Sequence, residues 1–138
     1  MRAYTYAYYP GCALHSSAKE YDISARLVCE ELGIKLQEID GWTCCGASSA
    51  HSTSHLLSIA LPARELQAAE EMGLPLTVAC AMCFSRLKYA AYELADRANL
   101  DLVKELLDKE FHNTTEVVHL LKVLYEEREA IPLRRPLK

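Results

Sequence analysis

Two adjacent cysteines followed by a glycine, Cys44-Cys45-Gly46, constrain this chain more than any other feature of its sequence. Neighbouring cysteines are poor disulfide partners, because the ring they would close strains the peptide between them and their Cα atoms barely reach the separation that a bridge needs. Two thiols held so close together are better suited to bind one metal centre. Its remaining ligands must then come from other parts of the chain.

Single cysteines lie far to either side of the pair, Cys12 upstream and Cys80 and Cys83 downstream. The first residues do not form the apolar core of a signal peptide, so we expect these thiols to stay reduced in the cytoplasm. No apolar run approaches the roughly 20 residues of a membrane span, and any membrane attachment is expected through a partner. The formal net charge of −4 does not indicate a nucleic-acid partner.

The 138 residues, 51% of them hydrophobic, alternate between short apolar segments and helical patterns. We expect strands at residues 2–9, 34–39 and 74–79, each bounded by glycine or proline. Helices are expected after residue 16, and after a serine-rich entry at Ser48–Ser54, with an apolar face from Leu56 to Met72 and a kink or restart at Pro62. Further helices are expected from Cys83, from a cap at Asn99 to Leu107, and over Val117–Glu127. The first helix is expected to bury the apolar residues that recur at helical spacing: Tyr21, Ile23, Leu27, Val28 and Leu32.

This order of segments predicts an α/β fold. We expect a small parallel β-sheet of about three strands (βαβαβ), with helices on both faces and a helical C-terminal extension. Residues 1–130 are expected to form one cysteine-rich domain. Residues 131–138, which include two prolines, are expected to be a linker-like tail.

The predicted strands bring the cysteines together. Cys12, the adjacent pair and Cys80 each follow the carboxyl end of a strand, and in an open parallel sheet those ends form the edge where ligands bind. Cys83 lies one helical turn beyond Cys80 at a helix N-terminus, whose positive dipole favours thiolates. Cys29 lies inside a helix away from this edge and is expected to be a buried hydrophobic residue.

Five thiols at one edge leave more than one chemistry open. Zinc needs four ligands, so Cys12, Cys80, Cys83 and one of the pair could close a structural site with one thiol to spare. An iron–sulfur cluster suits five thiolates better, because its several irons each need ligands. A third alternative is thiol–disulfide exchange through Cys80 and Cys83.

Two histidines, His51 and His55, follow the cysteine pair at a helical spacing of four. On a shared helix face near the ligand edge they could donate protons or, less readily, bind metal. The competing interpretation is an ordinary polar helix face, and His15 is a similar case. Surface or hydrogen-bonded core positions are expected for His112 and His119, and positions packed around the site for Tyr8, Tyr9 and Trp42.

Three segments resemble a known family: Tyr9-Pro10-Gly11-Cys12, Trp42-Thr43-Cys44-Cys45-Gly46 and Cys80-Ala81-Met82-Cys83. Their order of one cysteine, an adjacent pair and a CxxC motif resembles the cysteine-rich CCG domain of the B-type subunit of heterodisulfide reductase, from the first strand to about residue 127. Such subunits usually carry two of these domains in tandem. The chain is similar to the N-terminal half, as a truncated chain or as one part of a split subunit.

The resemblance implies a noncubane 4Fe-4S cluster at which a disulfide is bound and cleaved by one-electron steps. The ligands carried over by position would be Cys12, Cys44, Cys45, Cys80 and Cys83. The implied partners are electron-donating iron–sulfur or flavin subunits, or a second CCG domain, and His51 and His55 are our own candidates for proton donors. We therefore expect a component of an oxidoreductase that can be inactive alone. The alternative is a zinc-binding or metal-free structural module that docks a partner redox subunit.

Overall fold

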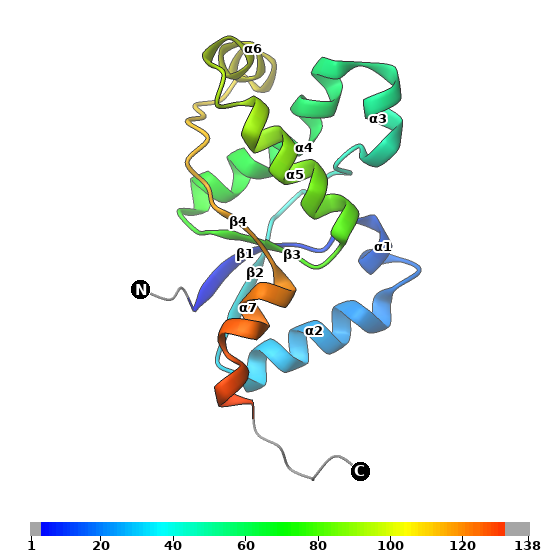
Figure 1. Ribbon diagram of the computed structural model, residues 1–138, viewed down its shortest axis with the longest axis vertical. Coiled ribbons are helices and arrows are strands. Elements are labelled where there is room, and N and C mark those ends of the chain that lie inside the picture. The colour runs from blue at the N-terminus through cyan, green and yellow to red at the C-terminus, as the bar shows by residue number, and fades with distance from the viewer. Residues whose placement is uncertain (1–3, 132–138) are drawn as a thin grey trace.

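The computed structural model describes residues 4–131 and contains a sheet of four parallel strands (Figure 1). Its strands are β1 (Thr5–Tyr9), β2 (Lys35–Glu38), β3 (Leu76–Val78) and β4 (Val117–His119), in the spatial order β2-β1-β3-β4. Every neighbouring pair runs in parallel. The predicted α/β class and parallel sheet are therefore confirmed, with a fourth strand beyond the three expected.

Two layers of helices cover the two faces of the sheet (Figure 1). The helices are α1 (Gly11–His15), α2 (Lys19–Glu31), α3 (Ala47–Thr53), α4 (His55–Met72), α5 (Ala81–Glu93), α6 (Arg97–Leu107) and α7 (Leu120–Glu126), followed by the 3-10 helix η1 (Arg128–Ala130). One core joins α4, α5 and α6 to one sheet face, and a smaller core joins α2 and α7 to the other. Successive residues of a strand therefore serve different cores, as Val117 and Val118 of β4 do.

The strand order reverses direction once. From β1 the chain crosses to β2 on one side, and from β2 it crosses back over β1 to β3 and then β4. In a doubly wound sheet this reversal leaves a crevice at the carboxyl ends of the two strands where it occurs, here β1 and β3. Cys12 and Cys80 follow those two strands directly.

The predicted helix over Val117–Glu127 is wrong in its first turn. Val117 and Val118 form β4 and pair with Leu76 and Thr77 of β3. Two consecutive β-branched residues favour a strand wherever an edge is available to pair with. The helix α7 begins only after His119, whose ring nitrogen Nδ1 accepts a hydrogen bond from the backbone N–H of Leu121 at 3.0 Å.

The predicted buried face of the first helix is also wrong. Four of its five expected core residues are exposed on α2: Tyr21, Ile23, Leu27 and Val28. The face toward the sheet instead carries Ala25 and Cys29, whose small side chains let the helix approach closely. Polar groups complete that face, since Asp22 accepts a 2.7 Å hydrogen bond from the hydroxyl of Tyr8.

Two smaller details of the helices differ from expectation. The helix α4 continues through Pro62, and the chain breaks instead at Ser54, which separates α3 from α4 and caps α4. Burial of the surrounding turns offsets the hydrogen bond that proline cannot make. The cap of α6 is Asp96, whose carboxylate accepts from the N–H of Ala98 at 2.9 Å, and not Asn99.

Parts of two sequence predictions lie outside the described residues. These are positions 1–3, which include the start of the first strand, and 132–138, nearly all of the linker-like tail. The division into a domain of 1–130 and a tail stays a prediction. Within residues 4–131 no helix is both long enough and apolar enough to cross a membrane.

Candidate functional site

Five cysteines gather at the carboxyl edge of the sheet. Cys12 lies in α1 directly after β1, while Cys44 and Cys45 lie in the loop between β2 and α3. Cys80 is the N-cap of α5 after β3, and Cys83 lies in the first turn of α5. Segments far apart in the sequence thus meet at the carboxyl edge of the sheet, as the sequence predicted, and this is where the strand order reverses.

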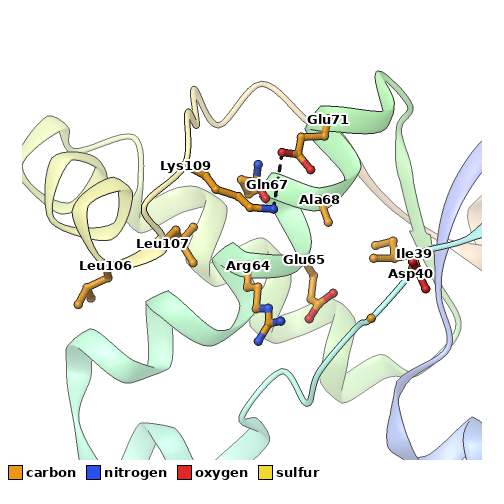
Figure 2. Close-up of a pocket in the computed structure, with 11 residues that line it drawn as sticks. Ile39, Asp40, Arg64, Glu65, Gln67, Ala68, Glu71, Leu106, Leu107 and Lys109 are labelled. Carbon is orange, nitrogen blue, oxygen red and sulfur yellow. Dashed lines mark ion pairs between the residues drawn. The ribbon is translucent and has the colours of Figure 1, made fainter.

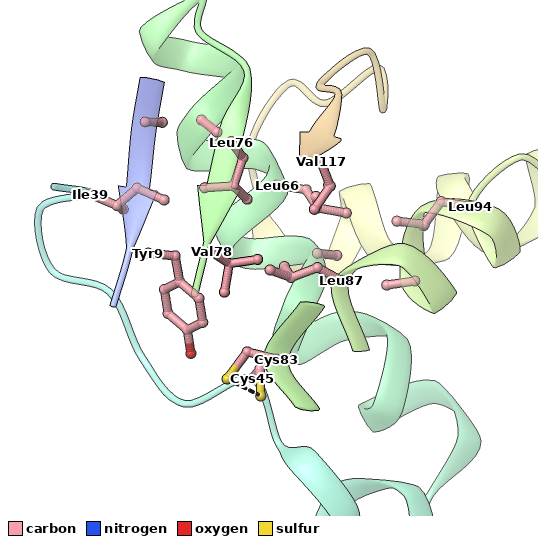
Figure 3. Packing of buried hydrophobic residues seen from close by; sticks show 14 of the residues in the cluster. Tyr9, Ile39, Cys45, Leu66, Leu76, Val78, Cys83, Leu87, Leu94 and Val117 are labelled. Carbon is pink, nitrogen blue, oxygen red and sulfur yellow. Dashed lines mark hydrogen bonds between the residues drawn. The ribbon is translucent and has the colours of Figure 1, made fainter. Parts of the chain in front are cut away.

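The five thiols form a continuous row of neighbours. Its centre is the pair Cys45 and Cys83, whose Sγ atoms lie 3.4 Å apart (Figure 3). Cys44 lies close enough to Cys45 and Cys12 to interact with both, and Cys83 interacts in the same way with Cys80 on the other side. Cys45 and Cys83 are buried, Cys80 is half-buried, and Cys12 and Cys44 are exposed at one end. The row therefore has a closed centre and an open end.

The thiol of Cys45 has a lowered pKa. The hydrogen bond between Cys45 and Cys83 lowers the pKa of Cys45 to about 6, helped by the backbone N–H groups of Ala47 and of Cys45 itself and opposed by burial. The same hydrogen bond, together with burial, raises the pKa of Cys83. The pKa values of the two thiols are therefore shifted in opposite directions. Metal binding would displace the remaining protons, because metal ligands must be deprotonated.

Two glycines allow the backbone to pass close to the sulfur atoms. Gly46 has a φ of +87°, and a Cβ there would lie 2.7 Å from the Cβ of Ala50 and 2.9 Å from Leu61. Gly11 has a φ of +77°, and its Cβ would lie 3.2 Å from the Sγ of Cys83. Both positions lie in the left-handed region that favours glycine. The glycine of the Cys-Cys-Gly motif is thus required by its conformation and by its packing.

The loop before the cysteine pair is held by side chains from two other elements. Glu65 of α4 accepts hydrogen bonds on Oε1 from the backbone N–H of Thr43 at 2.9 Å and from its hydroxyl at 3.1 Å. The hydroxyl of Tyr9 donates to the carbonyl of Thr43 at 2.8 Å. Trp42 packs edge-to-face against Tyr9 and His15, with ring centroids 5.5 and 5.3 Å apart.

Sequence reasoning placed Tyr9 and Trp42 beside the site but missed Glu65 and Thr43. The available signal was a glutamate next to Leu66 on the apolar face of a predicted helix. Burial raises the pKa of Glu65, although the hydrogen bonds from Thr43 oppose this shift. Figure 2 shows Glu65 extending from α4 toward the loop after β2, at a cavity of about 350 Å³ that Arg64 and Lys109 also line.

The histidines are distributed differently from the cysteines. His51 and His55 flank the ring of Tyr89, each with centroids 6.5 Å apart, on the part of α5 beyond Cys83. The Nε2 atom of His55 lies 3.8 Å from a carboxylate oxygen of Glu93. His15 lies on α1 with Cys12, packed against Trp42, and His112 is exposed.

Tyr8, expected beside the site, lies elsewhere, and His119 lies in a strand rather than in a helix. The side chain of Tyr8 faces α2 and hydrogen-bonds Asp22. His119, expected inside a helix, lies at the end of β4 against Phe84, with ring centroids 5.3 Å apart.

The donor set suits a cluster with several metal atoms. Within residues 4–131 no three Cys, His, Asp or Glu side chains converge as a group that could hold one metal ion. The five thiols are instead spread along a row, and thiolates are the usual ligands of iron–sulfur clusters. Thiols are therefore the type of donor that an iron–sulfur centre uses.

The sheet order and the cysteine row define a cysteine-rich domain of the doubly wound α/β class. Residues 6–88 match the family described as "CCG: Cysteine-rich domain". The chain belongs to this family.

Three relatives cover most of the chain. A protein of Wolinella succinogenes named as the membrane anchor subunit of 8-methylmenaquinol:fumarate reductase is 39% identical over 137 residues, which is 96% of this chain and 48% of that protein. A protein of Archaeoglobus profundus, named as similar to the B-type subunit of heterodisulfide reductase, is 25% identical over 96% of this chain and 46% of that protein. The B-type subunit of a CoB-CoM heterodisulfide reductase of Methanosarcina acetivorans is 24% identical over 85% of this chain and 41% of that protein. The chain spans about half the length of the curated relatives it matches.

A crystal structure of a hypothetical protein from Helicobacter pylori has the same fold. It superimposes on 100% of this chain and 27% of its own, with a TM-score of 0.79 and 21% sequence identity. At that identity the likeness supports the fold alone.

Proposed function

We propose that this chain is the iron–sulfur redox domain of a multi-subunit oxidoreductase. In this proposal it holds a noncubane 4Fe-4S cluster through Cys12, Cys44, Cys45, Cys80 and Cys83. The observation that carries the proposal is the continuous row of five thiols from three strand ends. The family match and the relatives named as heterodisulfide reductase subunits support an iron–sulfur centre.

Five neighbouring thiols favour a cluster over zinc. A structural zinc site is closed by four ligands arranged tetrahedrally around one point. A fifth thiol beside the others would then remain without a role, although all five lie at the same edge of the sheet and Cys45 is buried. A cluster with several irons gives each thiol an iron to bind.

The closed centre and the open end of the row suggest different roles. Cys45 and Cys83 are buried and would keep water away from one side of the cluster. Cys12 and Cys44 are exposed, so a substrate or a partner subunit would approach from their end. When bound, the cluster supplies one-electron transfer and an iron that can take one sulfur of a disulfide.

Disulfide reduction is the activity that we propose first. The overall step breaks one S–S bond and consumes two electrons and two protons to give two thiols. The electrons would come from an iron–sulfur or flavin subunit, in a complex that includes a second CCG domain. The protons would come from water or from His51 and His55, which lie in the exposed region beside Tyr89. We place this work in the cytoplasm.

A second candidate function is electron transfer without disulfide chemistry. The 39% identity to a subunit named for a methylmenaquinol:fumarate reductase favours it, since the two heterodisulfide reductase relatives are 25% and 24% identical. The chain would then relay electrons between partner subunits of a respiratory complex. The same row of thiols would serve either function.

Metal analysis after anaerobic purification tests the cluster. We expect brown protein with about four irons and four sulfides per chain, and an electron paramagnetic resonance (EPR) signal in one redox state. Colourless protein with one zinc per chain, purified without air, would support the zinc-binding or metal-free docking module instead. Disulfide reduction by metal-free protein that is lost in Cys80→Ser would support thiol–disulfide exchange.

A stoichiometric assay separates the two redox functions. The protein with its cluster is reduced chemically, freed of reductant and mixed with a small disulfide under argon. Release of two thiols per two electrons lost from the cluster supports disulfide reduction. Reoxidation by a quinone or by a partner subunit, with no thiol release from the disulfide, supports electron transfer.

A further inference from the structure

Glu65 is buried where an acidic side chain is costly. It is 1% exposed and is the only Asp, Glu, Lys or Arg classed as buried among residues 4–131. A buried carboxylate loses its hydration and destabilises the fold unless hydrogen bonds replace it. Glu65 accepts two hydrogen bonds from Thr43, the residue directly before Cys44.

All the polar groups of Thr43 are engaged. Its N–H and hydroxyl donate to Oε1 of Glu65 at 2.9 and 3.1 Å, and its carbonyl accepts from the hydroxyl of Tyr9 at 2.8 Å. This segment belongs to neither a helix nor a strand, so no regular hydrogen-bond ladder holds it. Side chains from α4 and β1 therefore fix the peptide that leads into the cysteine pair.

The same contacts join two of the cysteine segments. Tyr9 ends β1 and is followed by Pro10, Gly11 and Cys12. Figure 3 shows its ring pointing toward the edge where Cys45 and Cys83 meet. Tyr9 therefore ties Thr43 to the strand that leads into Cys12, while Glu65 ties Thr43 to α4. Together these contacts set the position of the cysteine pair relative to Cys12.

We propose that Glu65 is a positioning residue: through Thr43 it holds Cys44 and Cys45 in the geometry that accepts the cluster. The role rests on the proposed function for its purpose, but the fixing of the loop is a property of the metal-free chain. Groups that orient metal ligands from outside the ligand shell commonly change metal affinity by about 10–100-fold when they are removed.

The chain supplies a matched control on the same helix. Glu70 of α4 accepts hydrogen bonds from the N–H of Thr114 at 2.9 Å and from its hydroxyl at 2.6 Å. This is the same chemistry as that of Glu65 with Thr43, but it anchors the loop before β4, which carries none of the five cysteines. Loss of Glu70 should weaken the fold without disturbing the cluster.

The experiment compares Glu65→Ala, Glu65→Gln and Glu70→Ala. We expect Glu65→Ala to bind less iron and to lose it to a chelator about tenfold faster, with a changed EPR signal in the remaining cluster. Gln keeps a carbonyl oxygen that can accept both hydrogen bonds from Thr43, so Glu65→Gln should restore iron content to within about twofold of wild type. Glu70→Ala should keep its iron despite a lower melting temperature.

Amide hydrogen exchange in the metal-free proteins gives a readout that does not depend on the cluster. We expect Glu65→Ala to speed exchange at Thr43, Cys44 and Cys45, with Glu65→Gln and Glu70→Ala close to wild type at these amides. Unchanged exchange in Glu65→Ala would overturn the proposal, as would equal iron loss from Glu65→Ala and Glu70→Ala. A wild-type protein that takes up no iron overturns the proposed function instead, and the exchange data then still decide whether Glu65 fixes the loop.

Discussion

At the scale of single residues, the cysteine site depends on one shared proton. Cys45 and Cys83 lie 3.4 Å apart in a buried setting, where two thiolates would repel each other strongly. One of them must stay protonated until a metal arrives. The hydrogen bond with Cys83 lowers the pKa of Cys45, and backbone N–H groups at Ala47 and Cys45 lower it further.

This arrangement predicts an acidic thiol in the metal-free protein. With a pKa of about 6, Cys45 should be mostly thiolate at neutral pH and should protonate as the pH falls through that value. The thiolate absorbance in the ultraviolet, followed during an acid titration, should show one step near this pH. The step should vanish in Cys45→Ser, and a first step only near the ordinary thiol pKa in wild type would contradict the prediction.

Gly46 gives a second prediction at this scale. Gly46→Ala introduces a Cβ 2.7 Å from Ala50 and adds strain at a positive φ, so we expect a loss of about 2–4 kcal/mol in the free energy of unfolding. Gly33→Ala is the matched control. Its φ is +74° but no atom lies within 4 Å of the new Cβ, so it should cost only about 1 kcal/mol.

Denaturant unfolding of the metal-free proteins measures both glycine variants, and iron content measures the consequence for the site. Gly46→Ala should also reduce iron binding, because the displaced backbone carries Cys45. Equal stability losses at the two positions would show that packing at Gly46 contributes nothing.

At the scale of elements, the sequence predicted what depends on local pattern. The three strands that precede the cysteine segments were predicted from apolar residues bounded by glycine or proline. Their positions in the sequence therefore followed from short-range signals. Convergence of the five thiols then followed from the rule for parallel sheets. The class of fold and the meeting of the five cysteines at one edge were therefore both accessible from the sequence.

Contacts between elements set the features that were wrong or missed. The exposed apolar residues of α2 recur at helical spacing, so the sequence predicted that they would face the core. The helix instead contacts the sheet through polar side chains: Asp22 accepts a hydrogen bond from Tyr8, and Arg26 pairs with Glu38. The strand β4 exists because β3 offers it an edge. Glu65 could not be predicted either, because its partner is Thr43 in a distant loop.

The strand β3 provides the prediction at this scale. The side chain of Thr77 is 0% exposed, and its hydroxyl has no hydrogen-bond partner among residues 4–131. An unsatisfied buried hydroxyl is costly, and valine has nearly the same shape without it. Thr77→Val should therefore raise the free energy of unfolding by about 1 kcal/mol. Thermal unfolding of metal-free protein measures this, and a loss of stability would reveal a partner for the hydroxyl.

At the scale of the whole molecule, the two faces of the sheet carry different cores, and only one of these cores includes buried cysteines of the site. The face toward α4 and α5 carries the larger core, which includes Cys45 and Cys83. The face toward α2 and α7 carries the smaller core, which includes Cys29. Cys29 is 1% exposed, and burial raises its pKa, so it remains a neutral thiol.

Two matched cysteine variants test this division. Cys29→Ala leaves a small cavity in the smaller core and should cost about 1 kcal/mol of stability without loss of iron. Cys45→Ala removes a thiol that is equally buried, but from the row, so iron content should fall while the stability of the metal-free protein changes by a similar amount. Iron analysis and denaturant unfolding of both variants make the comparison. If Cys29→Ala lost as much iron as Cys45→Ala, the two faces of the sheet would not be independent. A change in the smaller core, beneath α2, would then disturb the cysteine row through the sheet.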